Sequence, residues 1–128
     1  MFIRSLFVTA ASCTLLSLAA AGDIKPYAQN TFDALTSTGK PVVLHFWASW
    51  CPTCKAQKPV LSQLMQASAY KDVTMLTVDY DAEKPLLQKY QVKQQSTLVA
   101  FKGGKEVGRS TGEVDREPIE SLVRKAVQ

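Results

Sequence analysis

Two cysteines separated by two residues, Cys51 and Cys54, have the clearest potential for chemistry in this sequence. They stand where an almost continuously apolar run, 42–47, gives way to a segment with helical spacing. A thiol in the first turn of a helix lies near unpaired backbone N–H groups and the positive end of the helix dipole, which favour its thiolate form. We therefore predict that Cys51 is a nucleophile. Cys54, one turn later, is expected to close a disulfide with it and release a bound substrate as its thiol.

A structural bridge or a metal site would be other uses of the same pair. Zinc takes about four ligands, whereas the chain after residue 21 offers two thiols and one histidine, His45, so no metal ligand is assigned. A bridge across two intervening residues closes a very short loop and adds little stability. Redox chemistry is the predicted use.

The first 21 residues have the three-part pattern of a secretory signal peptide. Arg4 lies near the start, the stretch 5–18 is uncharged, and residues 19–21 are three alanines. We expect cleavage between Ala21 and Gly22. Export follows from this expectation, and the periplasm is the predicted location.

Cleavage would leave one domain, residues 22–128, of a size that many single domains use. An uncleaved anchor facing the periplasm is the alternative, but the uncharged run 5–21 has only 17 residues, at the lower end of the roughly 17 to 25 that span a bilayer. Cleavage also removes Cys13, so two cysteines remain, too few for a disulfide scaffold.

The composition is that of an ordinary globular domain, with 46% hydrophobic and 20% charged residues. The net charge of +4 falls to +3 when Arg4 leaves with the signal peptide, and the lysines are spread along the chain. Such a surface does not predict a nucleic-acid partner.

The elements that must position the cysteines follow from hydrophobic periodicity. A strand over 41–48, a helix from 51 to about 68 kinked at Pro59, and a strand over 73–78 form a β-α-β unit with parallel strands. We also expect helices over 31–35 and 86–90, a hairpin of strands 97–101 and 106–111, and a last helix capped by Asp115 and reaching Val127. An initial β/α element precedes this unit. The predicted fold is α/β, with a central mixed sheet flanked by helices on both faces.

Residues 46–55, Pro59 and residues 97–104 resemble the thioredoxin superfamily, and the resemblance covers essentially all of residues 22–128. The Trp-Cys-Pro-Thr-Cys segment, 50–54, looks like that of exported thiol reductases, including those of cytochrome c maturation. The resemblance implies a thioredoxin fold and thiol–disulfide exchange on disulfide-containing or dithiol proteins, contributing to cell redox homeostasis without a dissociable cofactor. Substrate binding is assigned to Trp50, Pro52, Thr53, Gln95, Ser96 and Thr97. Trp50 is expected to shield one side of the sulfurs, and Phe46 and Trp47 to pack in the core.

Ser96 departs from the family pattern, because this position usually holds a cis-proline that faces the cysteines and docks substrate backbone. A cis bond before a residue other than proline costs about 3–4 kcal/mol, so we predict a trans Gln95–Ser96 bond and an altered loop. Two interpretations stay open. The Ser96 hydroxyl stabilises a thiolate or slows substrate release beside the sulfurs, or the serine is a tolerated loop change.

His45 is a second departure, because thioredoxins commonly bury an acidic group six residues before the first cysteine. The imidazole could act as general base for Cys54, having an unperturbed pKa of ~6.5 that burial would lower. A core histidine without a catalytic part is the alternative. The lysine that often accompanies the buried acid is replaced by Thr77, so the acid–lysine pair is absent.

The residues between the cysteines, Pro52 and Thr53, predict the direction of the reaction. Strong oxidants of the superfamily often carry a histidine there, and a threonine hydroxyl stabilises a thiolate less than an imidazolium does. We expect a monomeric reductase or isomerase that receives electrons from a membrane donor. A dithiol oxidase, a metal or iron–sulfur cluster shared by two chains, and a peptide-binding chaperone are the alternatives.

Overall fold

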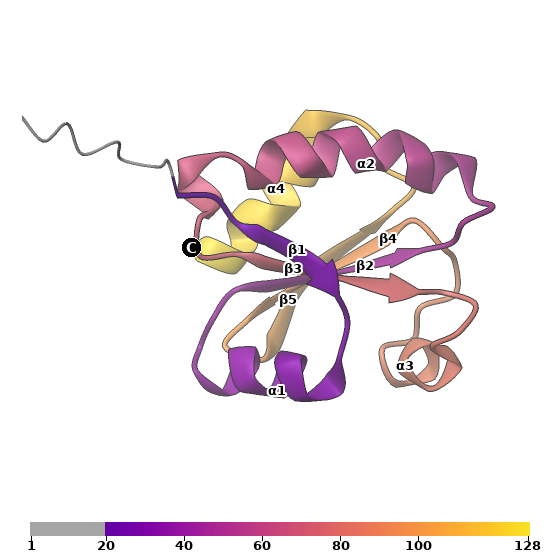
Figure 1. Cartoon of the computed structure of the whole chain (residues 1–128), viewed down its shortest axis with the longest axis horizontal. Coiled ribbons are helices and arrows are strands. Elements are labelled where there is room, and N and C mark those ends of the chain that lie inside the picture. Colours follow the sequence, from indigo (N-terminus) through magenta and orange to yellow (C-terminus); the bar gives the residue numbers. More distant parts are fainter. Residues whose placement is uncertain (1–19) are drawn as a thin grey trace, which may run out of the picture.

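The computed structural model describes residues 20–128, which form a five-stranded sheet with helices on both faces (Figure 1). The strand order is β1-β3-β2-β4-β5; β1, β3 and β2 are parallel, and β4 and β5 are antiparallel to their neighbours. The predicted α/β architecture with a mixed sheet is confirmed. In chain order the elements are β1 (Asp23–Pro26), α1 (Gln29–Ser37), β2 (Val42–Trp47), α2 (Pro52–Met65), the short 3-10 helix η1 (Ser68–Tyr70), β3 (Thr74–Asp79), α3 (Lys84–Lys89), β4 (Thr97–Lys102), β5 (Lys105–Thr111) and α4 (Arg116–Val127).

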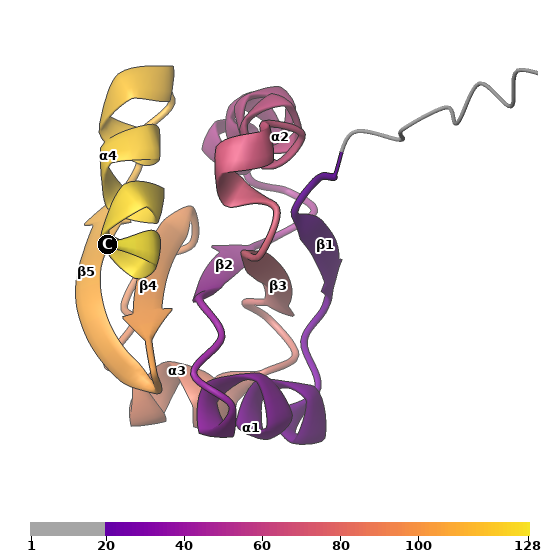
Figure 2. The same cartoon turned by 90° about the vertical axis from the view of Figure 1, so that its left-hand side faces the viewer.

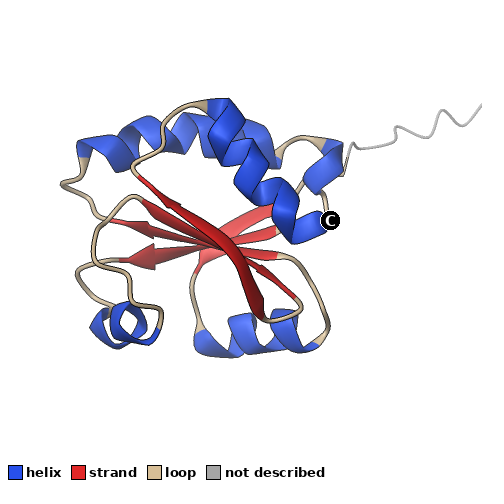
Figure 3. Cartoon of the chain, turned by 180° about the vertical axis from the view of Figure 1, so that it is seen from behind, coloured by secondary structure: helices blue, strands red, loops and turns tan. Residues whose placement is uncertain are grey.

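Helices α2 and α4 cover one face of the sheet, and α1 and α3 lie on the other (Figures 2 and 3). A hydrophobic cluster lies between the sheet and each pair of helices. Successive side chains of a strand point to opposite faces. In β2, Val43 belongs to the α2 and α4 cluster, whereas Leu44 and Phe46 belong to the α1 and α3 cluster. Burial on both faces explains the continuous apolar run of this strand. The same alternation places His45 on the face that α2 covers.

Several element boundaries differ from those predicted. β1 is exposed along its whole length, so no hydrophobic pattern marked it, yet it pairs with β3 through Ile24 opposite Met75. α1 is longer than the predicted 31–35, and α2 ends at Met65 because the chain turns into η1.

Asp115 stands at the start of α4, as predicted, but its carboxylate makes no capping hydrogen bond. The backbone carbonyl of Asp115 accepts from Ile119 N, at 3.5 Å. The expected side-chain cap is therefore wrong, and only the backbone of this residue begins the helix. Pro59 lies inside α2, where it has no N–H to donate to the preceding turn.

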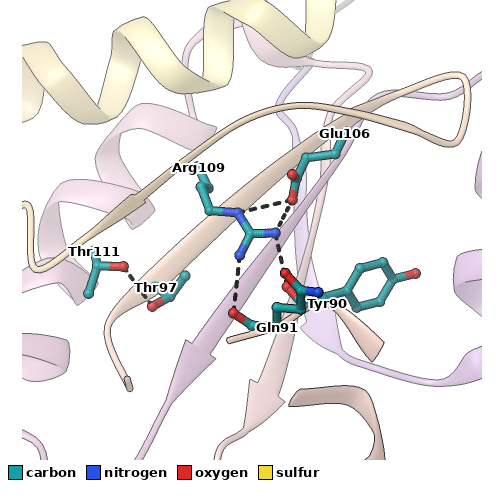
Figure 4. Close-up of polar contacts among 6 residues, drawn as sticks. All are labelled: Tyr90, Gln91, Thr97, Glu106, Arg109 and Thr111. Atoms are coloured by element: carbon teal, nitrogen blue, oxygen red, sulfur yellow. Dashed lines mark hydrogen bonds and ion pairs between the residues drawn. The ribbon is translucent and has the colours of Figure 1, made fainter. Parts of the chain in front are cut away.

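An arginine of the edge strand holds the end of α3 (Figure 4). The last carbonyls of a helix have no partner within it, and here the Arg109 guanidinium donates to the carbonyls of Tyr90 at 2.9 Å and Gln91 at 3.5 Å. Arg109 is also ion-paired with Glu106 on its own strand. Gln91 has a left-handed φ of 53°, as is common just after a helix. This contact fixes the segment that leads from α3 to Ser96.

Most of the predicted signal peptide, residues 1–19 with Arg4, lies outside the described residues. Gly22 is integrated into the domain, and its N–H donates to the carbonyl of Met65 at 2.7 Å. Cleavage before Gly22 stays a prediction. Within residues 20–128, no helix combines the length and the apolar character needed to cross a membrane.

Candidate active site

The two cysteines lie at the start of α2, where the sequence placed them. They form a disulfide with a Cα–Cα distance of 5.3 Å. Cys51 is the N-cap residue of α2, and its Sγ accepts a hydrogen bond from the backbone N–H of Cys54 at 3.1 Å. Pro52 occupies the first helical position, where its missing N–H is no loss. In the reduced protein, the same N–H and helix dipole would favour a thiolate on Cys51.

Aromatic side chains cover the cysteine pair, which is almost fully buried. Trp47 and Tyr80 pack against the cluster that the two cysteines form with Ala48. Trp50 is 56% exposed, and its indole N–H donates to the carboxylate of Asp81 at 2.8 Å. Trp47 and Tyr80 therefore cover the disulfide, and the hydrogen bond with Asp81 ties the Trp50 ring to the loop after β3. Shielding of the sulfurs by Trp50 stays a prediction.

Ser96 adopts an unusual backbone conformation, with a left-handed φ of 62°. No peptide bond among residues 20–128 is cis, so the predicted trans Gln95–Ser96 bond is confirmed. The Ser96 N–H donates to the carbonyl of Phe46 at 2.7 Å, and its hydroxyl donates to the carbonyl of Gln95 at 2.5 Å. The hydroxyl hydrogen is thus used within the loop. These bonds support the interpretation of Ser96 as a loop change.

The other predicted substrate-binding residues differ in their exposure. Thr97 is buried, and its hydroxyl donates to the Gln94 carbonyl at 2.8 Å. It also lies 2.9 Å from the Thr111 hydroxyl (Figure 4). Its side chain therefore orders the start of β4. Trp50 and Pro52 are exposed, and Thr53 and Gln95 are half-buried.

His45 is buried beneath α2, with 3% of its surface exposed. Its Nε2 lies 3.0 Å from Oε1 of Gln57, a fully buried residue of α2 that the sequence analysis missed. Helical spacing could have identified Gln57, because it lies three positions after Cys54 and four before Leu61 and so falls on the buried side of the helix.

A cavity of about 410 Å³ between α2 and the sheet brings His45 and Cys54 to a common space. Thr77 also lines it and lies opposite His45 in the β2–β3 pairing, where the comparison with the family placed it. Lys58 reaches the same cavity, with its Nζ 5.7 Å from the centre of the Trp47 ring. Most of the exposed lining is apolar. Lys58 of α2 therefore places a positive charge at the cavity lined by Thr77, the residue that replaces the usual lysine of the family.

The environment of His45 favours the neutral imidazole. Burial lowers its pKa below the usual 6.5, the hydrogen bond with Gln57 acts in the opposite direction, and the Lys58 charge lowers it further. A neutral imidazole can accept a proton, as a general base must. Within residues 20–128, no group of three or more His, Cys, Asp or Glu side chains is arranged to hold a metal ion.

The lowered pKa of His45 predicts a loss of stability in mild acid. The unfolded chain takes up a proton on this histidine below about pH 6.5, whereas the folded protein does so only at a lower pH. The free energy of unfolding should therefore fall from pH 7.5 to 5.5. Urea unfolding of the wild type and His45→Gln tests this, because His45 is the sole histidine of the sequence. Equal pH dependence in both proteins would contradict the assignment.

Comparison with known proteins finds a thioredoxin family model that matches residues 23–125. A thioredoxin of Chlamydia trachomatis is 40% identical over 84 residues, covering 66% of this chain and 80% of that protein. Thioredoxin H2-1 of Oryza sativa is 37% identical over 92 residues, covering 72% of this chain and 64% of that protein.

Solved structures give the same result for the fold. The crystal structure of Trxlp from Edwardsiella tarda matches with a TM-score of 0.76 and 35% identity, covering 78% of this chain and 97% of that one. A mutant thioredoxin from Halobacterium salinarum matches with a TM-score of 0.73 and 25% identity, covering 88% of this chain and 96% of that one.

Proposed function

The chain belongs to the thioredoxin family and is a thiol–disulfide oxidoreductase acting on disulfide-containing proteins, and from this premise we propose that it reduces or isomerises disulfides of exported proteins. One observation carries the chemical part of the proposal: the Cys51–Cys54 disulfide caps the N-terminus of α2. The predicted signal peptide supports the exported location.

The reaction is a two-electron exchange between the cysteine pair and a substrate disulfide. The Cys51 thiolate attacks one sulfur of the substrate, forming a mixed disulfide and releasing the other sulfur as a thiolate. Cys54 then loses its proton and attacks Sγ of Cys51, so the second substrate sulfur leaves. The substrate ends as a dithiol, and the protein ends with the Cys51–Cys54 disulfide that the structure contains. His45, at the shared cavity, is the proposed acceptor of the Cys54 proton.

The proposed direction is reduction, because Thr53 stabilises a thiolate less than a cationic side chain would. A protein that reduces substrates in an oxidising compartment must be reduced again after each cycle. We assign this step to a membrane donor of electrons.

The reduction potential of the cysteine pair tests this direction. Equilibration against defined thiol buffers, followed by tryptophan fluorescence, should give a value near the −270 mV or so of thioredoxin. Trp47 and Tyr80 pack at the disulfide, so fluorescence should report its state. A value near the −120 mV or so of strong oxidants would overturn the proposal in favour of a dithiol oxidase. Failure to form an intramolecular bridge would overturn the dithiol–disulfide cycle.

Export is tested independently of the redox chemistry. When the full chain is expressed in a Gram-negative host, the periplasmic fraction should contain a protein whose N-terminal sequence begins at Gly22. An intact protein with Met1 that remains in the cytosol would contradict export. A full-length protein retained in the membrane fraction would favour the anchored form.

A further inference from the structure

The buried amide of Gln57 joins three separate segments of the fold. Its Oε1 contacts Nε2 of His45 in β2, at 3.0 Å. Its Nε2 donates to the Ser96 carbonyl before β4, at 3.1 Å, and to the Glu113 carbonyl before α4, at 2.8 Å. Gln57 is fully buried, and its bonds to His45 and Ser96 are buried with it.

The two carbonyl partners determine which way the amide faces. A backbone carbonyl only accepts hydrogen bonds, so Ser96 and Glu113 require the NH₂ group of Gln57. Its Oε1 must then face the imidazole, and this oxygen also only accepts. Nε2 of His45 therefore carries a hydrogen, and in the neutral imidazole the free lone pair is on Nδ1.

We propose that Gln57 is a positioning residue, which holds His45 as the Nε2–H tautomer with Nδ1 as proton acceptor and ties that imidazole to the Ser96 loop. The inference rests on the proposed function at one point, the transfer of the Cys54 proton to His45. The tautomer itself follows from the three hydrogen bonds alone.

The tautomer matters for the second half of the reaction. When Cys54 attacks the mixed disulfide, its S–H bond breaks and an Nδ1–H bond forms on His45. The new imidazolium still donates from Nε2 to Gln57, and this bond becomes stronger because the donor is charged. The proton on Nδ1 then passes, directly or through solvent, to the departing substrate thiolate, and His45 returns to its neutral form. With the opposite tautomer, Nδ1 would already be occupied and could accept nothing.

The other groups around the imidazole leave Gln57 as its hydrogen-bonding partner. Thr77 of β3 and Leu98 of β4 are its neighbours in the sheet, and neither titrates. The charged side chains at the cavity are Lys55 and Lys58 of α2, and its titratable thiol in the reduced protein is that of Cys54. The other polar groups that line this space are Ser49, Ser62 and Thr77, and none of them makes a hydrogen bond with the imidazole.

The test compares Gln57→Met with Gln63→Met, the same substitution on the exposed side of the same helix. Imidazole ¹⁵N chemical shifts should show protonated Nε2 and unprotonated Nδ1 in the wild type and in Gln63→Met. Gln57→Met should show a mixture of tautomers. The rate at which Cys54 resolves a preformed mixed disulfide should fall about tenfold, by analogy with the loss of partners that orient metal-ligating histidines. The pH dependence of this rate should also shift. Gln63→Met should keep the wild-type profile.

Each outcome decides one part of the inference. Protonated Nδ1 in the wild type would overturn it without any variant, even if Gln57→Met failed to fold. An unchanged tautomer in folded Gln57→Met would also overturn it. If the tautomer changed but the pH profile of the resolution rate did not, Gln57 would not act on the reaction through His45. Resolution at the wild-type rate in His45→Ala would refute the proposed base, while the ¹⁵N shifts would still decide the role of Gln57.

Discussion

Replacing Cys51 by serine should reduce the rate of disulfide reduction by on the order of 10³-fold or more, because an alcohol at this position is not ionised as a thiolate is. Cys54→Ser should have a different effect. Cys51 would still attack, but the mixed disulfide would persist because no second thiolate expels the substrate. Turnover with a disulfide-containing test protein, and mass spectrometry under non-reducing conditions, measure the two effects.

The two serine variants serve as controls for each other. Both remove the same disulfide and change a buried sulfur at the same end of α2. Any general loss of stability should therefore be similar in the two variants. A difference between them in activity or trapping then reports the chemical step at which each cysteine acts. A trapped substrate on Cys51→Ser rather than Cys54→Ser would reverse the proposed roles. Trapping on neither variant would contradict covalent exchange.

Ser96→Pro should lower the free energy of unfolding by about 2–4 kcal/mol. Proline has no N–H, so the buried carbonyl of Phe46 would lose its 2.7 Å hydrogen bond from residue 96. Proline also fixes φ near −65°, whereas Ser96 has a φ of +62°. The loop would therefore have to rebuild around the new residue. Urea unfolding at pH 7 measures the loss.

Ser96→Gly is the matched control for this prediction. Glycine keeps the N–H and adopts positive φ without strain, so it loses only the hydroxyl bond to Gln95. Its stability should lie within about 1 kcal/mol of the wild type. A Ser96→Pro protein as stable as the wild type would show that the loop accepts the usual proline geometry.

Turnover per folded molecule of Ser96→Pro is a separate test of whether Ser96 affects substrate release. Unchanged kinetics would favour the tolerated loop change.

The sequence predicts the redox chemistry of this protein better than it predicts the hydrogen bonds of Gln57 that support the site. The Cys-x-x-Cys pair follows an apolar strand and opens a helix, and both features depend on local sequence. The position of His45 under α2 follows from strand alternation. The partnership of Gln57 with His45, Ser96 and Glu113 is different, because it arises only when three segments distant in sequence pack around one side chain.

The exposed parts of the fold were the hardest to predict. β1 has no buried residue, so neither alternation nor an apolar run identifies it, and its pairing with β3 depends on backbone hydrogen bonds. The side chain of Asp115 was expected to cap α4 by residue type alone. Whether a capping residue uses its carboxylate depends on local geometry that the sequence does not reveal.

The two edges of the sheet are poor templates for another strand. At one edge, β1 has only four residues, with Lys25 exposed and Pro26 unable to donate a backbone hydrogen bond. At the other edge, β5 carries Lys105 and Arg109 and is paired irregularly with β4 at Ala100 and Phe101. Charges, proline and bulges hinder edge-to-edge association. A partly unfolded, strand-forming substrate should therefore be held through its sulfur and released after reduction, instead of being captured by growth of the sheet into an aggregate.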